Sequence, residues 1–206
     1  MERGALDPFP FPDCTGALLS GGQASRLGGV AKGLLRVQGE PIIARSLSLF
    51  RQLFPVSVVV ANDGAPYVPF GAPVLGDLIA GKGAPSGLHT ALVAARTDWV
   101  FTAACDMPFL AAGPIAWLAA RRERTRAVAV FWRGHLEPLH AFWPRSCLPL
   151  VDRMLREGYP SLWTIATAVG MCAIPEEQWR QIDPEGRAFA NVNTPEEAAQ
   201  LGLEMP

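Results

Sequence analysis

A glycine-rich stretch near the start of the chain, residues 18–33, limits the possible folds more than any other part of the sequence. A short apolar run at 17–19, typical of a strand, leads into five glycines, Arg26 and Lys32. Glycines let a backbone turn tightly and approach a ligand closely, and successive N–H groups in such a turn bind anions. We therefore predict a loop that holds a nucleoside triphosphate. A surface loop with two solvated charges is the alternative.

Two familiar phosphate-binding motifs do not match this stretch. The phosphate loop of many NTPases reads G-x-x-x-x-G-K-[ST], but here Lys32 follows Ala31 and precedes Gly33. The dinucleotide fingerprint G-x-G-x-x-G fails as well, because two glycines are adjacent at 21–22 and the next one is at 28. The sequence therefore indicates a third kind of nucleotide loop.

The composition bounds the classes of protein that this chain can form. Its 206 residues, half of them apolar, suffice for one sizeable core. We predict a single domain over 14–206 and a flexible, proline-rich arm over 1–13. The net charge is −1, from 18 basic and 19 acidic residues, which gives no overall field for nucleic acid or an anionic membrane. Any phosphate is therefore bound by a local site.

Two absences in the sequence indicate the compartment. No apolar run approaches the length of a membrane span, and the first 13 residues lack the apolar core of a signal peptide. The four cysteines lie far apart, at positions 14, 105, 147 and 172, and imply neither a zinc site nor a disulfide framework. We expect a cytoplasmic protein.

Strand-like and helix-like segments alternate along the chain. Apolar, β-branched runs such as 56–60 are typical of strands buried on both faces of a parallel sheet. The alternation predicts an α/β fold, a single Rossmann-like three-layer domain with a mostly parallel sheet. We expect strands at 15–19, 34–37, 56–60, 73–75, 99–104, 127–132, 136–143 (edge or antiparallel) and 189–193. We expect helices at 41–53, 86–96, 114–124, 147–156, 161–169 and from 195.

Polar residues follow several of these strands, and ligands of such sheets bind at the carboxyl ends of strands. Asp77 and Asp106 each come where a predicted strand ends. A carboxylate at position 106 can hold Mg²⁺, which takes one or two protein carboxylates and fills its shell with water and substrate phosphate. An aspartate that only closes a turn is the alternative.

The pair Asn191 and Asn193 marks a further strand end. Because side chains alternate along a strand, both asparagines are expected on one face, where their amides can position phosphate or metal-bound water. Alternatively, Asn193 only begins the turn before a helix that Thr194 caps and Pro195 starts. That alternative leaves Asn191 unexplained.

Other catalytic signatures are missing from the sequence. His89, His135 and His140 have no metal-ligand spacing. No G-x-S-x-G elbow is present, which disfavours a serine hydrolase.

Three motifs occur together over about residues 15–201. They read Leu-Ser-Gly-Gly-x-x-Ser-Arg-Leu-Gly-Gly at 19–29 with Lys32, Cys-Asp-Met-Pro at 105–108, and Asn-Val-Asn-Thr-Pro-Glu-Glu at 191–197. Together they resemble the molybdenum cofactor guanylyltransferases, a family often called MobA. The first motif is shared with other nucleotidyltransferases, whereas the last is closer to the molybdopterin group. The resemblance implies a fold of the nucleotide-diphospho-sugar transferase type.

The resemblance also implies a reaction. Enzymes of this family transfer GMP from MgGTP to the terminal phosphate of molybdenum-bound molybdopterin and release pyrophosphate. The implied cofactor is Mg²⁺, and the implied substrates are GTP and molybdenum-molybdopterin. Transient contacts with molybdopterin-supplying proteins and acceptor molybdoenzymes are implied as well. An attacking phosphate oxygen is already anionic and needs no general base, which agrees with the lack of a catalytic triad.

Individual residues receive roles through the same resemblance. Arg26 and Lys32 are implied to stabilise charge on the triphosphate, and Asp106 to bind Mg²⁺. Asn191 and Asn193 are implied on the phosphate and pterin side. The residues implied to meet the nucleotide are Leu19, Ser20, Gly21, Gly22, Lys32, Asn62 and Asp77.

The chain departs from the family pattern in three places. Ala31 stands where the family usually has an aspartate before the loop lysine, a charge that can orient Lys32. Ala61 follows the valine run where the family has an asparagine, and Asn62 comes one place later. The proline of a Gly-Pro-Leu-Ala-Gly pattern is shifted by one within 83–87.

Two other functions fit parts of the same pattern. A sibling transferase that uses CTP on molybdopterin, or an NTP on a sugar phosphate, shares the first motif. A non-catalytic protein that binds or delivers molybdopterin would keep the fold without the chemistry. Such a binder would tolerate loss of Asp106, whereas this chain retains it together with Lys32 and Arg26, which favours an enzyme.

Overall fold

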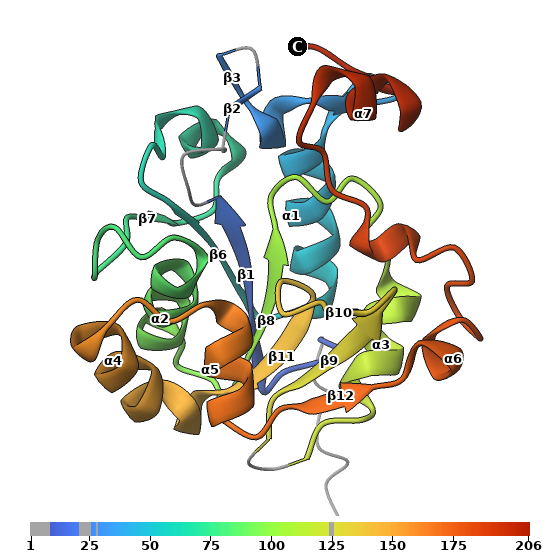
Figure 1. Ribbon diagram of the computed structural model, residues 1–206. Helices are drawn as coiled ribbons and strands as arrows, with labels where there is room; N and C mark the ends of the chain where they lie inside the picture. The colour runs from blue at the N-terminus through green and yellow to red at the C-terminus, as the bar shows by residue number, and fades with distance from the viewer. Residues whose placement is uncertain (1–8, 21–25, 28, 124–125) are drawn as a thin grey trace, which may run out of the picture.

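A mixed β-sheet forms the centre of the molecule (Figure 1). The computed structural model describes residues 9–20, 26–27, 29–123 and 126–206. Within these residues the sheet has eight strands, in the order β10–β9–β11–β8–β1–β6–β7 with β12 beside β9. Its strands are β1 (Cys14–Ser20), β6 (Val56–Ala61), β7 (Val74–Leu75), β8 (Trp99–Ala104), β9 (Val128–Trp132), β10 (His135–Leu136), β11 (Ala141–Pro144) and β12 (Cys172–Ile174).

Strand β1 lies between two parallel neighbours. Leu19 stands beside Val60 of β6 on one side and Ala104 of β8 on the other. Because β1 and β8 run in the same direction, Ser20 and Asp106 come together at one edge of the sheet. The expected α/β fold with a mostly parallel sheet is confirmed, and the antiparallel pairs of this sheet are β10 with β9, β11 with β9 and β11 with β8.

Helices cover both faces of the sheet, which gives three layers (Figure 1). On one side lie α2 (Ala84–Ala94), α4 (Leu148–Glu157) and α5 (Leu162–Ala168), and on the other lie α1 (Ile42–Leu53) and α3 (Ala112–Ala119). The side chains of β1 alternate between the two faces of the sheet, so successive residues pack against different helices. Leu18 belongs to the core cluster beneath α1 and α3, whereas Leu19 belongs to the cluster beneath α2, α4 and α5.

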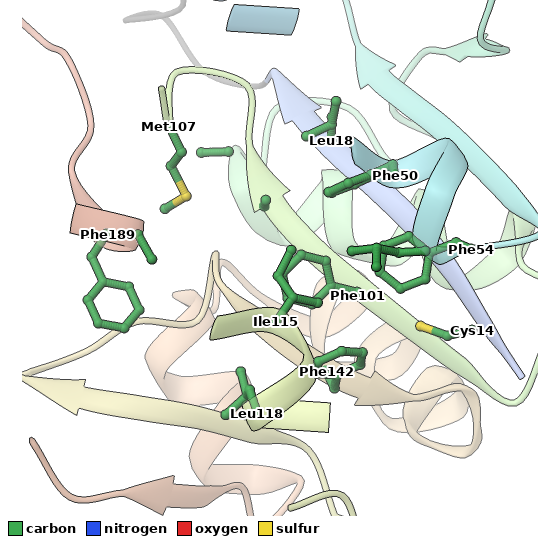
Figure 2. Packing of buried hydrophobic residues seen from close by; sticks show 14 of the residues in the cluster. Cys14, Leu18, Phe50, Phe54, Phe101, Met107, Ile115, Leu118, Phe142 and Phe189 are labelled. Atoms are coloured by element: carbon green, nitrogen blue, oxygen red, sulfur yellow. The ribbon is translucent and has the colours of Figure 1, made fainter. Parts of the chain in front are cut away.

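The core beneath α1 is rich in aromatic rings (Figure 2). Phe54 and Phe101 stack at 5.8 Å between ring centres, and Phe50 meets Phe54 edge to face at 5.2 Å. Gly16 of β1 lies directly under these rings, and a Cβ there would stand 2.6 Å from both Phe50 and Phe54. Glycine is therefore required at this position for α1 to pack so closely on the central strand.

The C-terminal segment returns to the loop end of the sheet (Figure 1). Strand β13 (Leu203–Glu204) pairs with β4 (Arg36–Val37), which pairs with β5 (Glu40–Pro41). Val192 packs in a small cluster with Leu27 and Leu35. These contacts hold residues 191–193 beside the glycine-rich region. The remaining elements are β2 (Arg26–Leu27), β3 (Val30–Ala31), η1 (Lys32–Leu34), η2 (Ala65–Phe70), η3 (Arg145–Cys147), α6 (Glu176–Trp179), η4 (Arg187–Phe189) and α7 (Pro195–Gln200).

Three expected elements differ from the structure. The strand expected at 189–193 is wrong: η4 ends at Phe189 and the following residues are irregular. The amide of Asn193 is unavailable to a sheet because it donates to Glu197 Oε2 at 2.6 Å. The helix expected at 114–124 ends at Ala119, and the segment 136–143 divides into β10 and the antiparallel, interior β11.

All four cysteines lie within the described ranges and are free thiols, three of them buried. Among the helices of the described residues, none combines the length and the apolar character needed to span a membrane.

Candidate active site

A small cavity lies at the carboxyl ends of β1 and β8. Its volume is about 190 Å³. Its walls come from the ends of β1 and β8, from η1 and α2, and from the segment that precedes α7. Six of its lining residues were predicted for the site: Leu19, Ser20, Lys32, Asp106, Asn191 and Asn193. The structure thus brings together residues from three distant motifs.

Lys32 lies at the centre of this arrangement. It opens the short helix η1, and its side chain is almost fully buried. The Lys32 ammonium donates to Asn193 Oδ1 at 2.8 Å and forms an ion pair with Asp106 Oδ2 at 3.3 Å. Both partners come from other motifs, so Ala31 does not deprive the lysine of an orienting group.

Asp106 carries the negative charge of the cavity. Its side chain is 15% exposed. Burial raises the pKa of the Asp106 carboxyl, and the nearby Lys32 ammonium opposes that rise. The pair therefore presents an anion and a cation side by side in a largely dry site, where both charges act strongly on a bound ligand.

Ser20 is held by a residue that sequence reasoning missed. Tyr67 of η2 is buried, and its hydroxyl lies 2.8 Å from Ser20 Oγ and 3.8 Å from Cys105 Sγ. Burial raises the pKa of the Tyr67 hydroxyl, and it raises that of the Cys105 thiol to about 11, so both stay neutral. No local pattern marks Tyr67, because its contacts form only in the folded chain.

Asn62 and Asp77 form a separate pair on the β6–β7 side. Asn62 Nδ2 donates to Asp77 Oδ2 at 2.8 Å, and the Asp77 amide donates to Asn62 Oδ1 at 2.9 Å. Partial burial raises the pKa of the Asp77 carboxyl, against the opposing effect of Asn62. Neither residue lines the cavity that holds Lys32. The structure thus pairs these two predicted residues with one another.

Three of the predicted site residues are described only in part or not at all. Gly21 and Gly22 lie outside the described residues. The backbone of Arg26 belongs to β2, which pairs with β3, and only its backbone is described. The positions of these residues in the site stay predictions.

The donor set of the cavity suits Mg²⁺. Across the described residues, no group of three or more His, Cys, Asp or Glu side chains is arranged to hold a metal ion. Mg²⁺ commonly takes one or two protein carboxylates and completes its octahedral shell with water and substrate phosphates. The partly exposed Asp106 carboxylate, with amide oxygens nearby, fits an ion that arrives with a triphosphate.

The mostly parallel sheet carries a paired cation and carboxylate in a cavity at its carboxyl edge, an arrangement that suits nucleotidyl transfer. The family described as "MobA-like NTP transferase domain" matches residues 16–168. This match covers most of the chain, and the chain belongs to that family.

Similar proteins agree with this assignment. A molybdenum cofactor guanylyltransferase from Desulfosudis oleivorans is 31% identical over 184 residues, which are 89% of this chain and 91% of that protein. Another from Cupriavidus pinatubonensis is 31% identical, with 90% of this chain and 94% of that protein covered.

Solved structures resemble the whole fold. Molybdopterin-guanine dinucleotide biosynthesis protein A from Archaeoglobus fulgidus superposes with a TM-score of 0.74 at 25% identity, covering 90% of this chain and 95% of that chain. The 2-C-methyl-D-erythritol 4-phosphate cytidylyltransferase from Thermus thermophilus gives 0.62 at 17% identity, covering 89% and 95%. The second likeness concerns the fold alone.

Proposed function

We propose that this protein transfers GMP from MgGTP to molybdenum-bound molybdopterin, forming molybdopterin guanine dinucleotide and releasing pyrophosphate. The observation that carries the proposal is the contact of the buried Lys32 side chain with Asp106 and Asn193, which unites the three motifs in one cavity. The names of its relatives, molybdenum cofactor guanylyltransferases, support the choice of nucleotide and acceptor.

The reaction requires positioning and charge stabilisation from the protein. An oxygen of the acceptor phosphate forms a bond to the α-phosphorus of GTP, while the bond to the bridging oxygen of the β-phosphate breaks. The electron pair leaves with pyrophosphate. The attacking oxygen is anionic at neutral pH, so the site needs no base, and a buried ammonium such as that of Lys32 stabilises the developing charge.

Asp106 is the residue that would hold Mg²⁺. When bound, the ion neutralises charge on the triphosphate oxygens. Asn191 and Asn193 supply amide groups on the same wall of the cavity, and Ser20 and Leu19 bring the end of β1 against the ligand. Arg26, Gly21 and Gly22 complete the triphosphate loop in this proposal, and Asn62 with Asp77 lies on the nucleoside side.

The proposal also includes the compartment, the domain bounds and the protein partners. The protein acts in the cytoplasm as a domain over 14–206, with 1–13 as an arm. It takes the acceptor from proteins that supply molybdopterin and passes the product to molybdoenzymes through transient contacts. The near-zero net charge agrees with partners bound at local sites.

The decisive experiment removes the Asp106 carboxylate. Asp106→Ala is expected to lose Mg²⁺-dependent formation of the guanine dinucleotide by at least about 100-fold, the scale for one electrostatic group of an active site, while thermal unfolding stays cooperative. Product is measured by chromatography after incubation with MgGTP and molybdenum-molybdopterin. Asp98→Ala is a matched control, because Asp98 is exposed and precedes β8, the strand that Asp106 follows. Full activity in Asp106→Ala contradicts the metal assignment.

A further inference from the structure

Tyr67 lies behind the wall of the cavity that holds Lys32 and Asp106. The residue is 1% exposed and is not among the residues that line the cavity. A bound substrate therefore cannot touch it. A phenylalanine would fill the same space in the core, whereas a buried hydroxyl is costly unless it is hydrogen-bonded. The groups that the hydroxyl meets therefore indicate what this residue does.

The Tyr67 hydroxyl meets the ends of two strands. It lies 2.8 Å from Ser20 Oγ, at the end of β1, and 3.8 Å from Cys105 Sγ, directly after β8. Both of these residues line the cavity. Because Cys105 immediately precedes Asp106, the hydroxyl fixes the start of the turn that carries the carboxylate. One buried oxygen thus ties together two walls of the site.

The Tyr67 ring meets a third segment, the short helix η1. A Cβ on Gly33 would stand 3.0 Å from Cε1 of the ring and 3.3 Å from the hydroxyl oxygen. Gly33 does not adopt the left-handed conformation, so glycine serves here for the close approach of the ring and not for its backbone freedom. Since Gly33 follows Lys32 in η1, the ring limits where the backbone of the lysine can lie.

Tyr67 is itself held firmly. It lies in η2 between Pro66 and Pro69, whose rings fix their own φ angles. Its amide donates to the carbonyl oxygen of Gly64 at 2.9 Å, and its side chain belongs to the core cluster beneath α1 and α3. The hydroxyl and the ring therefore stand at fixed places before any ligand arrives, which lowers the cost of ordering a site when the ligand binds.

We propose that Tyr67 is a positioning residue of the nucleotide site. Its hydroxyl fixes Ser20 and the turn that carries Asp106, and its ring fixes the backbone beside Lys32. The proposal rests on the proposed function and adds to it a residue outside the cavity that orders the site for the nucleotide.

The test is a double-mutant cycle on the binding of MgGTP, measured by titration calorimetry without the acceptor. Tyr67→Phe removes one oxygen atom and keeps the ring, and Ser20→Ala removes the partner hydroxyl. Each single variant is expected to raise the Kd of MgGTP about five- to tenfold, the scale for one hydrogen bond between neutral groups. The double variant should lose much less than the product of the two losses, because residues that act through one contact are not additive.

Tyr159→Phe is the matched control, since Tyr159 is the other tyrosine of the chain and is 82% exposed. This variant should leave the Kd of MgGTP unchanged. A purely structural role of Tyr67 predicts a lower melting temperature with an unchanged Kd well below unfolding, and that result overturns the proposal. Losses that multiply in the double variant overturn it too, because Tyr67 would then act independently of Ser20.

Gly33→Ala is a second test, which keeps the Tyr67 hydroxyl and presses a methyl group against the ring. The Kd of MgGTP is expected to rise about fivefold or more, because small displacements of positioned groups are costly. Gly113→Ala, where a Cβ meets nothing within 4 Å, is its control and should bind as the wild type does. Unchanged binding by Gly33→Ala contradicts the role of the ring.

The binding cycle separates this proposal from the proposed function. A wild-type protein that binds MgGTP with the expected coupling but forms no guanine dinucleotide supports the role of Tyr67 and contradicts the proposed function alone. A wild-type protein that forms the dinucleotide while the Tyr67 and Ser20 losses multiply contradicts the role of Tyr67 alone. A wild-type protein that does not bind MgGTP contradicts both.

Discussion

At the scale of single residues, Lys32 shows how the site is assembled. A buried ammonium is costly unless it is paired, and this one contacts Asp106 and Asn193, which lie 74 and 161 residues further along the chain. The three segments that carry these residues are therefore held around one charge. The identity of each residue is visible in the sequence, but their common cavity exists only in the fold.

His140 is a second buried polar residue, but unlike Lys32 it is surrounded by apolar groups. It is fully buried, and no described residue pairs with either of its ring nitrogens. Aromatic rings surround it, with Phe101, Phe189 and Trp179 at 5.1, 5.4 and 5.6 Å between ring centres. Burial lowers the pKa of His140 to about 4, so the folded protein holds a neutral imidazole.

We predict that His140→Leu stabilises the protein at low pH. The unfolded chain binds a proton at His140 below about pH 6.5, whereas the folded protein does so only below about pH 4. The unfolded state therefore holds more protons in that window, and the wild type loses about 3 kcal/mol as the pH falls through it. Urea unfolding at pH 7, 5.5 and 4 is the measurement.

The matched substitution for this comparison is His135→Leu, at an exposed histidine of β10. The difference in free energy of unfolding between His140→Leu and wild type should grow toward pH 4, and that of the control should not. A difference that is constant with pH would show that the pKa of His140 is the same in the folded and the unfolded protein, and would contradict the prediction.

At the scale of elements, the predictions from the sequence succeeded where the pattern is local. Strand β8 is buried along its whole length, as its apolar sequence predicts. The helix start at Thr194 was also visible, because its capping box is a local motif. The strand expected at 189–193 failed since Glu197 captures the Asn193 amide, and Tyr67 was missed because its partners are distant in sequence.

The capping box gives a prediction for the site. Glu197 accepts from the amides of Asn193 and Thr194, at 2.6 and 3.3 Å, and so fixes the residue that contacts Lys32. Glu197→Ala is expected to lower the free energy of unfolding by about 1 kcal/mol, the usual effect of losing a cap. Turnover should fall several-fold at saturating GTP, because Asn193 is no longer held.

Glu196→Ala serves as the control, since Glu196 is an exposed neighbour in the first turn of the same helix. Stability is followed by thermal unfolding and turnover by product formation at a temperature well below unfolding. If both variants lose the same activity, helix stability or charge at the helix start explains the effect, and the positioning of Asn193 does not.

At the scale of the whole molecule, the strand order arranges the chemistry. Parallel strands bring the ends of β1 and β8 to one edge, with the Asn62–Asp77 pair toward one end of the sheet. A cavity of about 510 Å³, lined by Phe109, Trp132 and Phe189, lies toward the other end. The sequence predicted the α/β class and this edge. This second cavity was not predicted, because its walls come from four separate segments whose meeting no local pattern reveals.

Nucleotide binding by the whole molecule is measurable without the acceptor. A ligand that binds only the folded state stabilises it by about 2.7 kcal/mol at 100 times its Kd, which corresponds to roughly 5–10 °C in melting temperature for a chain of this size. MgGTP is expected to give this shift, with MgCTP and MgATP well below it, and Asp106→Ala should weaken the shift while Asp98→Ala keeps it. A larger shift with MgCTP contradicts guanylyl transfer, yet it leaves the nucleotidyltransferase assignment intact, because the fold and the Lys32–Asp106 cavity serve either base.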